Sequence, residues 1–458
     1  MLALELNDAL LTLAGDQPDA PPVTAPGVAC VTEEGVLTGD AAARRAKLQP
    51  LRSYLRYWQE LASVPLGRAH QPQLTAADLA FEQLRALFAA AGEAPAQLLV
   101  AVPPLLTREQ LGLLLGVAAE AGAGEIGLVD AALAACALAP VPTHVLHLEL
   151  YRHVAIVTAI ERTAEGARRA RVEAIPDWGT QRIEQRVVES IAAQFVRQTR
   201  FDPLHDAQLE QQLADGAWNW LQALSGAETV EVTLPQAGPD VPVQWNRAAW
   251  QEAGEAIGKT LLQLVQTARP AGQAVELRLG AVAQRVPGLA ERLATLSSCE
   301  LSLLPAGAAA RGALLHAAQI LRGANPALVC QLPLAPRDGS ATEPASPAFA
   351  RTGTAATHIV HDARAWPLAG LPLTIGTQVQ TSERGLQLPA GSPGVSRVHC
   401  RVHAVEGVVS VEDLSTYGTF VNDERVHGRA PLLRGDVLRL GTPGIPLQLI
   451  ELVSAPWP

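Results

Sequence analysis

The chain has 458 residues, five cysteines and a formal net charge of −10 at pH 7. A chain of this length is expected to fold as two or three domains, and its abundant Ala and Leu favour aliphatic cores. The negative charge argues against nucleic acid and anionic membranes as partners, because proteins that bind them need a concentrated basic face.

The cysteines are far apart and form neither a CxxC pair nor a cluster with histidine, which is typical of a reducing compartment. The first residues, MLALELNDALLTL, lack the basic segment of a secretory signal. No uncharged run reaches the roughly 18 residues that a membrane-spanning helix needs. We therefore predict a cytoplasmic protein with no membrane span and no metal site.

The N-terminal sequence LALELNDALLTL, at 2–13, has an echo in LHLELYRHVAIVT, at 146–158. Each copy has Leu-x-Leu-Glu-Leu, a short polar interruption and a second apolar run. This pattern predicts a β-hairpin with a carboxylate at the end of its first strand. The repetition indicates a duplicated half-fold.

Helices and strands alternate between the two copies. Capping boxes at Thr75 with Asp78 and at Thr107 with Gln110 predict the starts of two helices. The runs QLLVAVP and EIGLV are typical of strands that flank the second helix. Such alternation predicts an α/β fold around a central sheet.

The order of these elements resembles the actin-like ATPase fold shared by actin, sugar kinases and the 70-kDa heat-shock chaperones. The hairpins correspond to that family's two phosphate loops. VAVPPLLTREQLGLLLGVAAEAG is similar to the chaperones' connecting segment, WGTQRIEQRVVESIAAQF to their glycine turn and crossover helix, and VELRLGAVAQRVPGLAERL to their adenosine motif. The resemblance covers 1–322 and implies an α/β actin-like, ribonuclease-H-like duplicated domain whose two lobes hold a nucleotide between them.

The phosphate loops depart from the family pattern. The first loop of the family begins with Asp, Gly and Thr, whereas this chain has Glu5, Asn7 and Asp8. Asp8 would place negative charge where the phosphates should lie. In the second loop, the glycines that let backbone N–H groups approach a phosphate are replaced by Tyr-Arg-His at 151–153. These side chains would fill the space.

The remaining nucleotide positions are altered as well. Gly280 of the adenosine motif is followed by Ala281 rather than a second glycine. Glu5 and Glu149 are one methylene longer than the family's aspartates, which moves a carboxylate by more than a metal site tolerates. We therefore expect no catalytic residues, no ATP or Mg²⁺ cofactor and no ATPase activity. The vestigial nucleotide-binding positions are Glu5, Asn7, Asp8, Glu149 and Gly280.

Residues 323–357 are rich in Pro, Ala, Ser and Thr and show no sustained period of 2 or 3.6. Such a segment cannot bury enough apolar area to offset the cost of ordering it. We predict that it is a flexible linker between a large domain at 1–322 and a small domain at 358–455.

The small domain is predicted to be all-β, because short alternating runs are broken by glycine-containing turns. It resembles a forkhead-associated (FHA) domain, a β-sandwich that binds phosphothreonine peptides through loops at one end. GVSRVHC matches the Ser-Arg-x-His signature of that family, DLSTYGTFVN its Ser-Thr-Asn-Gly-Thr region, and LLRGDVLRLG its Gly-Asp turn and closing strand.

The FHA resemblance implies a role for each matching residue. Ser396, Arg397 and Thr416 would contact the phosphate, and Tyr417 would lie beside the peptide. His399 would tie the loops together and Asn422 would brace a turn. The expected structural positions are Gly376, His399, Gly418 and Asn422.

Two positions weaken the expected phosphate site. Thr377 stands where the family has its main phosphate-binding arginine, and Tyr417 replaces the Asn that holds the peptide backbone. An arginine fork is the strong part of such a site, so Arg397 or Arg384 would have to compensate. Phosphothreonine binding and phosphate-independent binding through the same loops therefore remain alternatives.

Together these features predict a non-catalytic scaffold or adaptor. Its FHA module would recognise a protein partner, and its degenerate actin-like domain would serve as a protein-interaction body that could form homo-oligomers. A working phosphate site would imply a Ser/Thr kinase pathway. The alternative is a divergent ATP-binding, chaperone-type ATPase regulated through its FHA domain. In a third hypothesis, the actin-like lobe is a structural remnant without nucleotide function, and the protein belongs to a secretion or envelope assembly.

Overall fold

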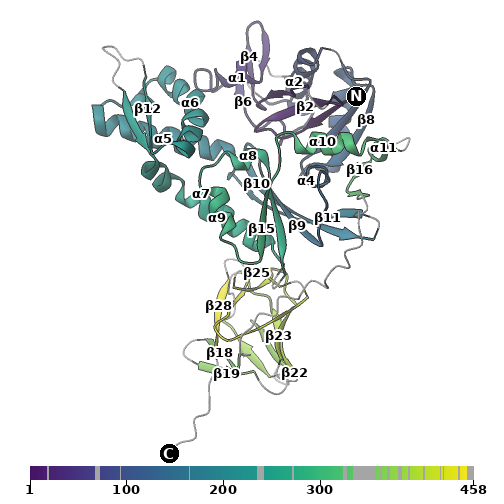
Figure 1. Cartoon of the computed structure of the whole chain (residues 1–458), viewed down its shortest axis with the longest axis vertical. Helices are drawn as coiled ribbons and strands as arrows, with labels where there is room; N and C mark the ends of the chain where they lie inside the picture. The colour runs from purple at the N-terminus through teal and green to yellow at the C-terminus, as the bar shows by residue number, and fades with distance from the viewer. Residues whose placement is uncertain are drawn as a thin grey trace, which may run out of the picture. The chain divides into compact units, whose positions relative to one another are not determined.

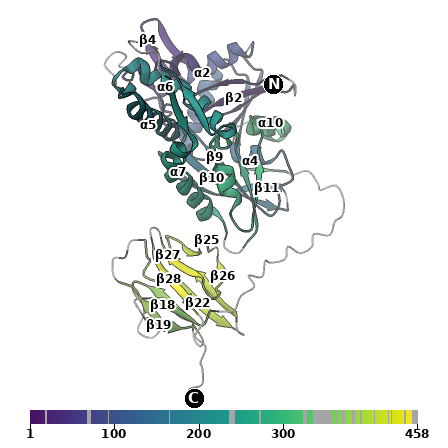
Figure 2. The same cartoon turned by 60° about the vertical axis from the view of Figure 1, so that its left-hand side comes forward.

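The chain is described here by a computed structural model, shown in Figures 1 and 2. It divides into a large unit, residues 1–262 with 276–337, and a small unit, residues 263–275 with 338–458. Each unit is described by itself. The residues that the structure describes are 1–17, 20–67, 73–92, 94–164, 166–234, 242–270, 273–322, 327–333, 356–361, 364–368, 372–379, 384–389, 392, 394–405, 408–422, 424–426, 428–441 and 444–450.

The first sheet of the large unit has the strand order β16-β8-β7-β1-β2-β3. Strand β1 pairs antiparallel with β2 and parallel with β7, which in turn pairs parallel with β8. The predicted N-terminal hairpin is therefore confirmed. The strands are β1 (Leu2–Glu5), β2 (Leu11–Gly15), β3 (Val23–Ala25), β7 (Gln97–Val102), β8 (Glu125–Asp130) and β16 (Leu328–Val329).

The second sheet has the order β15-β14-β9-β10-β11-β17 and repeats this arrangement. Its strand β9 pairs antiparallel with β10 and parallel with β14, as β1 does with β2 and β7. The second predicted hairpin is thus also confirmed. The strands are β9 (His144–Leu150), β10 (Val154–Thr163), β11 (Gly166–Pro176), β14 (Val275–Leu279), β15 (Cys299–Leu303) and β17 (Gln331–Leu332).

Two short alanine-rich helices, α4 (Ala131–Cys136) and α10 (Ala308–Leu315), share one hydrophobic core with strands of both sheets. The helices approach so closely that a Cβ on Gly312 would lie 1.8 Å from the carbonyl oxygen of Ala134. Small side chains therefore allow the two sheets to share a core. This close approach explains why alanine is so abundant in these segments.

The predicted capping boxes are confirmed at the N-termini of α2 (Ala76–Ala90) and α3 (Arg108–Glu120). Both helices pack on the first sheet around a core of leucine, valine and aromatic side chains. The other elements of the large unit are α1 (Asp40–Ala43), β4 (Ala29–Thr32), β5 (Gly35–Thr38), β6 (Ser53–Tyr54), α5 (Thr180–Thr199), η1 (Pro203–His205), α6 (Ala207–Gly226), β12 (Thr229–Val232), β13 (Val243–Asn246), α8 (Ala281–Gln284), α9 (Leu289–Ala294) and α11 (Ala317–Ile320). Helix α7 (Arg247–Ala268) begins in the large unit and runs past residue 262, where that segment of the unit ends.

The start of the predicted linker needs correction. Residues 328–332 form strands β16 and β17, which pair with β8 and β11 of the large unit, and Leu332 is fully buried. Strands of two residues are too short to show a periodic pattern, and the sheet edges that they join are made by distant segments of the chain. Residues 323–326 and 334–355 of the predicted linker lie outside the described residues, so their flexibility remains a prediction.

From residue 358 on, the small unit contains two sheets that enclose one aliphatic core, which confirms the all-β prediction for the described residues of 358–455 (Figure 2). One sheet has the order β19-β18-β28-β27-β24-β25 and the other β21-β20-β22-β23-β26. The strands are β18 (His358–His361), β19 (Arg364–Pro367), β20 (Leu373–Gly376), β21 (Gly385–Gln387), β22 (Cys400–Val405), β23 (Val408–Asp413), β24 (Thr419–Val421), β25 (Glu424–Arg425), β26 (Arg429–Pro431), β27 (Val437–Leu440) and β28 (Ile445–Ile450).

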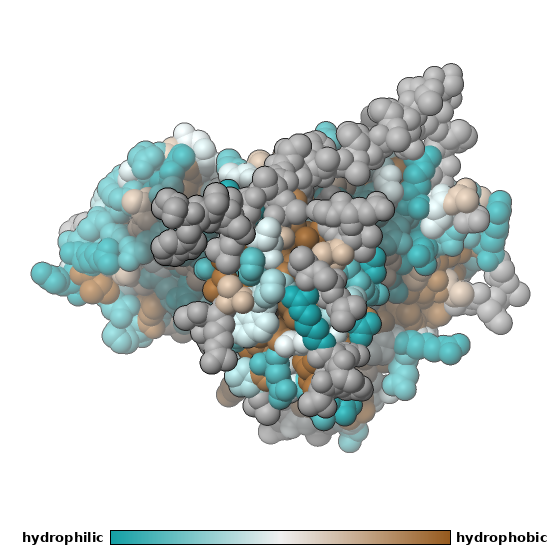
Figure 3. Space-filling view, turned by 90° about the horizontal axis from the view of Figure 1, so that it is seen from below, coloured by the Kyte–Doolittle hydropathy of each residue, from teal (hydrophilic) through white to brown (hydrophobic). Residues whose placement is uncertain are grey.

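No helix within the described ranges is both long enough and apolar enough to cross a membrane. On the face shown in Figure 3, hydrophobic and hydrophilic side chains of the coloured residues lie interspersed.

Candidate functional site

Ser396 lies in the loop that leads into β22, beside the loop between β23 and β24. Its Oγ accepts a hydrogen bond of 3.1 Å from the backbone N–H of Thr416. A serine hydroxyl that accepts one bond still has its own proton to donate. The two loops are thus joined in a way that leaves the Ser396 hydroxyl available as a donor to a ligand.

The buried ring of His399 holds the same two loops together. Its Nδ1 accepts a 3.0 Å hydrogen bond from the N–H of Ser396, and its Nε2 lies 3.0 Å from the carbonyl oxygen of Gly418. Because Nδ1 is the acceptor, the proton of the neutral ring is on Nε2, which donates to Gly418. Burial lowers the pKa of His399 and favours this neutral form.

The loop after β23 is held by its own side chains. Asp413 accepts hydrogen bonds from the N–H and Oγ of Ser415 at 3.0 and 2.7 Å, and from the hydroxyl of Thr419 at 2.7 Å. Gly418 donates to Ser415 Oγ and has a φ of 84°, a conformation that favours glycine. This turn leaves residues 416–417 exposed to solvent.

Thr377 also lies beside Ser396, because its N–H donates to the Ser396 carbonyl oxygen at 3.2 Å. A Cβ on Gly376 would lie 2.1 Å from the carbonyl oxygen of Arg397, so glycine allows β20 to approach this loop. The side chain of Arg397 is exposed, and it forms no ion pair with the residues that the structure describes. The backbone of Thr377, Ser396 and Thr416 thus comes together at one edge of the small unit, next to the exposed side chain of Arg397.

Arg384 does not belong to this edge, which corrects the expectation that it could compensate for the missing arginine. Strand β21 runs parallel to β20 with Thr374 opposite Gly385, so Arg384 lies at the end of β20 that is remote from Thr377. Its guanidinium donates instead to the carbonyl oxygen of Pro367. The parallel pairing could not be read from the sequence, in which Arg384 is close to Thr377.

Asn422 lies at the other end of β24. Its Nδ2 donates to Asp436 Oδ1 at 2.8 Å, and its Oδ1 accepts from the N–H of Val437 at 2.8 Å. Both bonds join the end of β24 to the start of β27. Asn422 thus braces a turn away from the two exposed loops.

Comparison with models of known families gives a match to the FHA domain over residues 373–441. The small unit contains an FHA domain. FHA domains bind phosphorylated protein partners, and the match includes both exposed loops. A search of curated proteins found no match to this chain.

The residues predicted to bind a phosphopeptide lie on these two adjacent FHA loops. Ser396 and Arg397 are on the first loop, and Thr416 and Tyr417 are on the second. Sequence reasoning missed the turn in which Asp413 bonds to Ser415 and fixes the backbone of the second loop. An Asp two residues before a Ser is a common turn signal.

Arg425 was also missed by the sequence analysis. The antiparallel pairing of Phe420 with Arg425 brings this arginine back beside the second loop. A Cβ on Gly418 would lie 2.8 Å from the Nε of Arg425. Only the hairpin of β24 and β25 reveals this proximity, because nothing in the local sequence marks Arg425 as a loop residue.

In the large unit, the turns of the two predicted phosphate loops bond directly to each other. The Nδ2 of Asn7 donates to the carbonyl oxygen of Leu150 at 3.1 Å, and Asp8 Oδ1 accepts from the N–H of Arg152 at 2.7 Å. The ring of Tyr151 is only 5% exposed. Protein groups therefore occupy the space between the turns.

The two predicted glutamates lie around a cavity of about 10 Å³, which is about enough for one water molecule. Glu5 Oε2 accepts a 3.0 Å bond from the N–H of Ala309, and Glu149 Oε1 accepts a 2.9 Å bond from the N–H of Leu150. A Cβ on Gly280 would lie 1.9 Å from Glu149 Oε2. The space that glycine leaves is thus filled by the Glu149 carboxyl group.

Burial, together with the neighbouring negative charge of Glu5, raises the pKa of Glu149 to about 8. Burial also raises the pKa of Glu5. Glu149 is therefore largely protonated at neutral pH, and a protonated carboxyl group is a poor Mg²⁺ ligand. No group of three or more His, Cys, Asp or Glu side chains within the described ranges could hold a metal ion.

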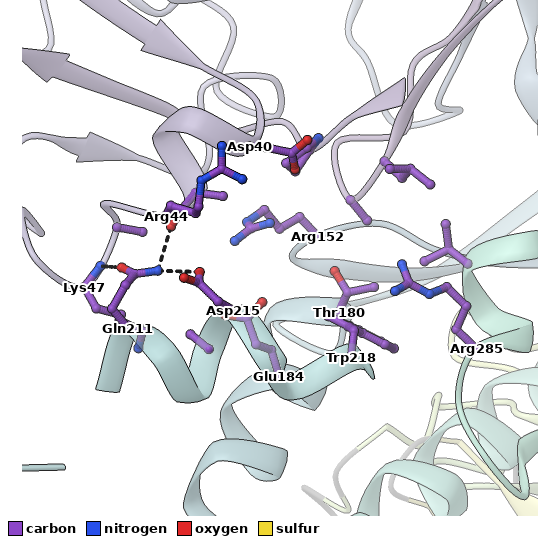
Figure 4. A pocket seen from close by; sticks show the side chains of 17 residues that line it. Asp40, Arg44, Lys47, Arg152, Thr180, Glu184, Gln211, Asp215, Trp218 and Arg285 are labelled. Carbon is purple, nitrogen blue, oxygen red and sulfur yellow. Dashed lines mark hydrogen bonds between the residues drawn. The ribbon is translucent and has the colours of Figure 1, made fainter. Parts of the chain in front are cut away.

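A larger cavity of about 370 Å³ lies beside these turns (Figure 4). The guanidinium of Arg152 points into it and donates to Gln181 Oε1 at 3.0 Å, and the residue is 8% exposed. The guanidinium of Arg285 lies 4.6 Å from the centre of the Trp218 ring. The cavity walls carry both signs of charge, from Asp40, Arg44, Lys47, Glu184 and Asp215.

Proposed function

We propose that the chain is a non-catalytic adaptor whose FHA domain binds a phosphothreonine-containing protein partner. The observation that carries this proposal is the bond between Ser396 Oγ and the N–H of Thr416, which holds two exposed loops together. It supports a site in which the Ser396 hydroxyl and the exposed Arg397 guanidinium, which pairs with no carboxylate of the described residues, both face a ligand. A phosphate, with almost two negative charges at pH 7, suits these donors.

The loops are arranged before any ligand arrives, which also supports the proposal. The neutral ring of His399 and the bonds of Asp413 fix the backbone around Ser396 and Thr416. A preorganised site loses little conformational entropy on binding. Thr377 contributes a neutral hydroxyl where the FHA family has an arginine, so we expect an affinity lower than that of an arginine-bearing FHA domain.

Ser396→Ala is expected to weaken binding of phosphothreonine peptides about tenfold or more, because a hydrogen bond to a charged group contributes roughly 1.5–3 kcal/mol. Fluorescence anisotropy of the full chain with a labelled degenerate phosphothreonine library would measure the loss. The matched control is Ser392→Ala, because the Ser392 hydroxyl bonds to Pro389 within the same loop region. Equal affinities of wild type and Ser396→Ala would contradict the assigned role.

We also propose that the large unit is a degenerate actin-like body that does not bind Mg-ATP. The repeated strand order of its two sheets supports the actin-like relationship. The direct bonds of Asn7 and Asp8 to the second turn, together with the buried Tyr151, support the loss of the phosphate site. Such a body would act as a protein-interaction surface for the adaptor.

Mg-ATP is therefore expected to leave the thermal unfolding of the full chain unchanged. A ligand that binds only the folded state stabilises it by about 2.7 kcal/mol at a hundredfold excess over its Kd, which a thermal shift assay would detect. Parallel samples with ATP and EDTA control for binding that does not need the metal. A rise in the unfolding midpoint that requires both Mg²⁺ and ATP would favour the ATP-dependent alternative.

A further inference from the structure

Two exposed hydrophobic side chains flank Thr416 on the second FHA loop. Leu414 is 43% exposed and Tyr417 is 57% exposed. Within the described part of the small unit, the remaining large hydrophobic side chain with comparable exposure is Val437, at 37%. Val437 bonds to Asn422 at the opposite end of β24. Among the described residues of the FHA domain, exposed apolar surface is thus concentrated at the loop that carries Thr416.

This loop cannot easily turn the two side chains inward. Asp413 and Ser415 fix its backbone through side-chain hydrogen bonds, and Gly418 closes the turn by donating to Ser415 Oγ at 2.7 Å. Covering exposed apolar surface is favourable in water, so a ligand that packs on it gains affinity. A rigid apolar surface next to polar donors is typical of a recognition site.

We propose that Leu414 and Tyr417 form an apolar ledge that selects a hydrophobic side chain close to the phosphothreonine of the ligand. This inference rests on the proposed function, because a phosphate bound at Ser396 and Thr416 would hold the ligand against the ledge. An extended peptide advances roughly 3.3 Å per residue. Since Tyr417 directly follows Thr416, its ring reaches ligand positions within about two residues of the phosphothreonine.

The chemistry of tyrosine explains why such a ledge discriminates between peptides. An Asn side chain at this position can donate and accept hydrogen bonds with a peptide backbone, which every sequence offers. The ring of Tyr417 instead offers a large apolar face that pairs best with aliphatic or aromatic side chains. The ligand class is therefore a phosphothreonine peptide with Leu, Ile, Phe or a similar residue beside the phosphothreonine.

The test uses the full chain and an oriented phosphothreonine library that varies three positions on each side of the phosphothreonine. A hydrophobic residue within two positions is expected to strengthen binding about tenfold over alanine. Tyr417→Ala should remove this preference while binding still requires phosphate, and Tyr417→Phe should retain it. Val437→Ala, which also truncates an exposed hydrophobic side chain, should change nothing.

The outcomes separate this inference from the proposed function. Phosphate-dependent binding with no hydrophobic preference, or with a preference that persists in a Leu414→Ala, Tyr417→Ala double variant, would overturn the ledge and leave the phosphate site standing. Binding that does not depend on phosphate would overturn both. Because both side chains are exposed, their truncation is not expected to unfold the domain, and the urea unfolding midpoint of each variant would verify this.

Discussion

Thr377→Arg is expected to strengthen binding of phosphothreonine peptides to the full chain about tenfold or more. The N–H of Thr377 already bonds to the Ser396 carbonyl oxygen, so a longer side chain at this position starts beside the proposed phosphate site. A guanidinium forms charge-assisted, forked hydrogen bonds with phosphate that a hydroxyl cannot form. Such bonds contribute roughly 1.5–3 kcal/mol, and about 1.4 kcal/mol corresponds to a factor of ten.

Titration of one labelled phosphothreonine peptide with each protein would measure this gain. Thr377→Lys is the matched comparison, because lysine adds a positive charge without the planar fork and should improve binding less. The unphosphorylated peptide should gain little from either change. An equal gain for both peptides would mean that the arginine acts as a general cation and would contradict the assigned phosphate position.

Glu149→Gln is expected to make the stability of the large unit much less dependent on pH. Burial raises the pKa of Glu149 from 4.5 to about 8. An acid with a raised folded-state pKa contributes full stability below its unfolded-state pKa, and this stability is lost as the pH rises through the folded-state pKa. Between pH 5 and pH 8, the wild type should therefore lose on the order of 3 kcal/mol that the variant does not lose.

Urea unfolding monitored by tryptophan fluorescence at pH 5, 6, 7 and 8 would measure this difference. The variant should gain stability relative to the wild type at each step toward pH 8. Glu60→Gln, which removes an exposed carboxyl group, serves as the control and should follow the wild type. Parallel pH profiles for wild type and Glu149→Gln would show that Glu149 is not held protonated by its surroundings.

Local patterns predicted local structure well. The repeated Leu-x-Leu-Glu-Leu runs predicted the hairpins of β1 with β2 and of β9 with β10. This worked because the alternation of apolar residues and the polar turn both lie within one short segment. The capping boxes placed the starts of α2 and α3 for the same reason. In the small unit, strong sequence signatures placed Ser396 and Thr416 on neighbouring loops.

Features that depend on how strands pair, or on contacts between distant segments, were not predictable. The position of Arg384 follows from the parallel pairing of β21 with β20, and that of Arg425 from the hairpin of β24 with β25. Strands β16 and β17 escaped notice because two residues carry no periodicity. The bond between Asn7 and Leu150 joins groups that are 143 residues apart. Sequence could indicate that the predicted phosphate loops depart from the pattern they resemble, but it could not indicate that the two turns contact each other.

The central claim is that the FHA loops recognise a phosphate, and removal of that phosphate tests it most directly. The tightest peptide selected from the phosphothreonine library would be titrated with the full chain before and after treatment with a phosphatase. Our account predicts that dephosphorylation weakens binding at least about tenfold, since it removes charge-assisted hydrogen bonds to Ser396 and Arg397. Unchanged affinity after dephosphorylation would contradict the account and would mean that these loops bind a protein surface without reading phosphate.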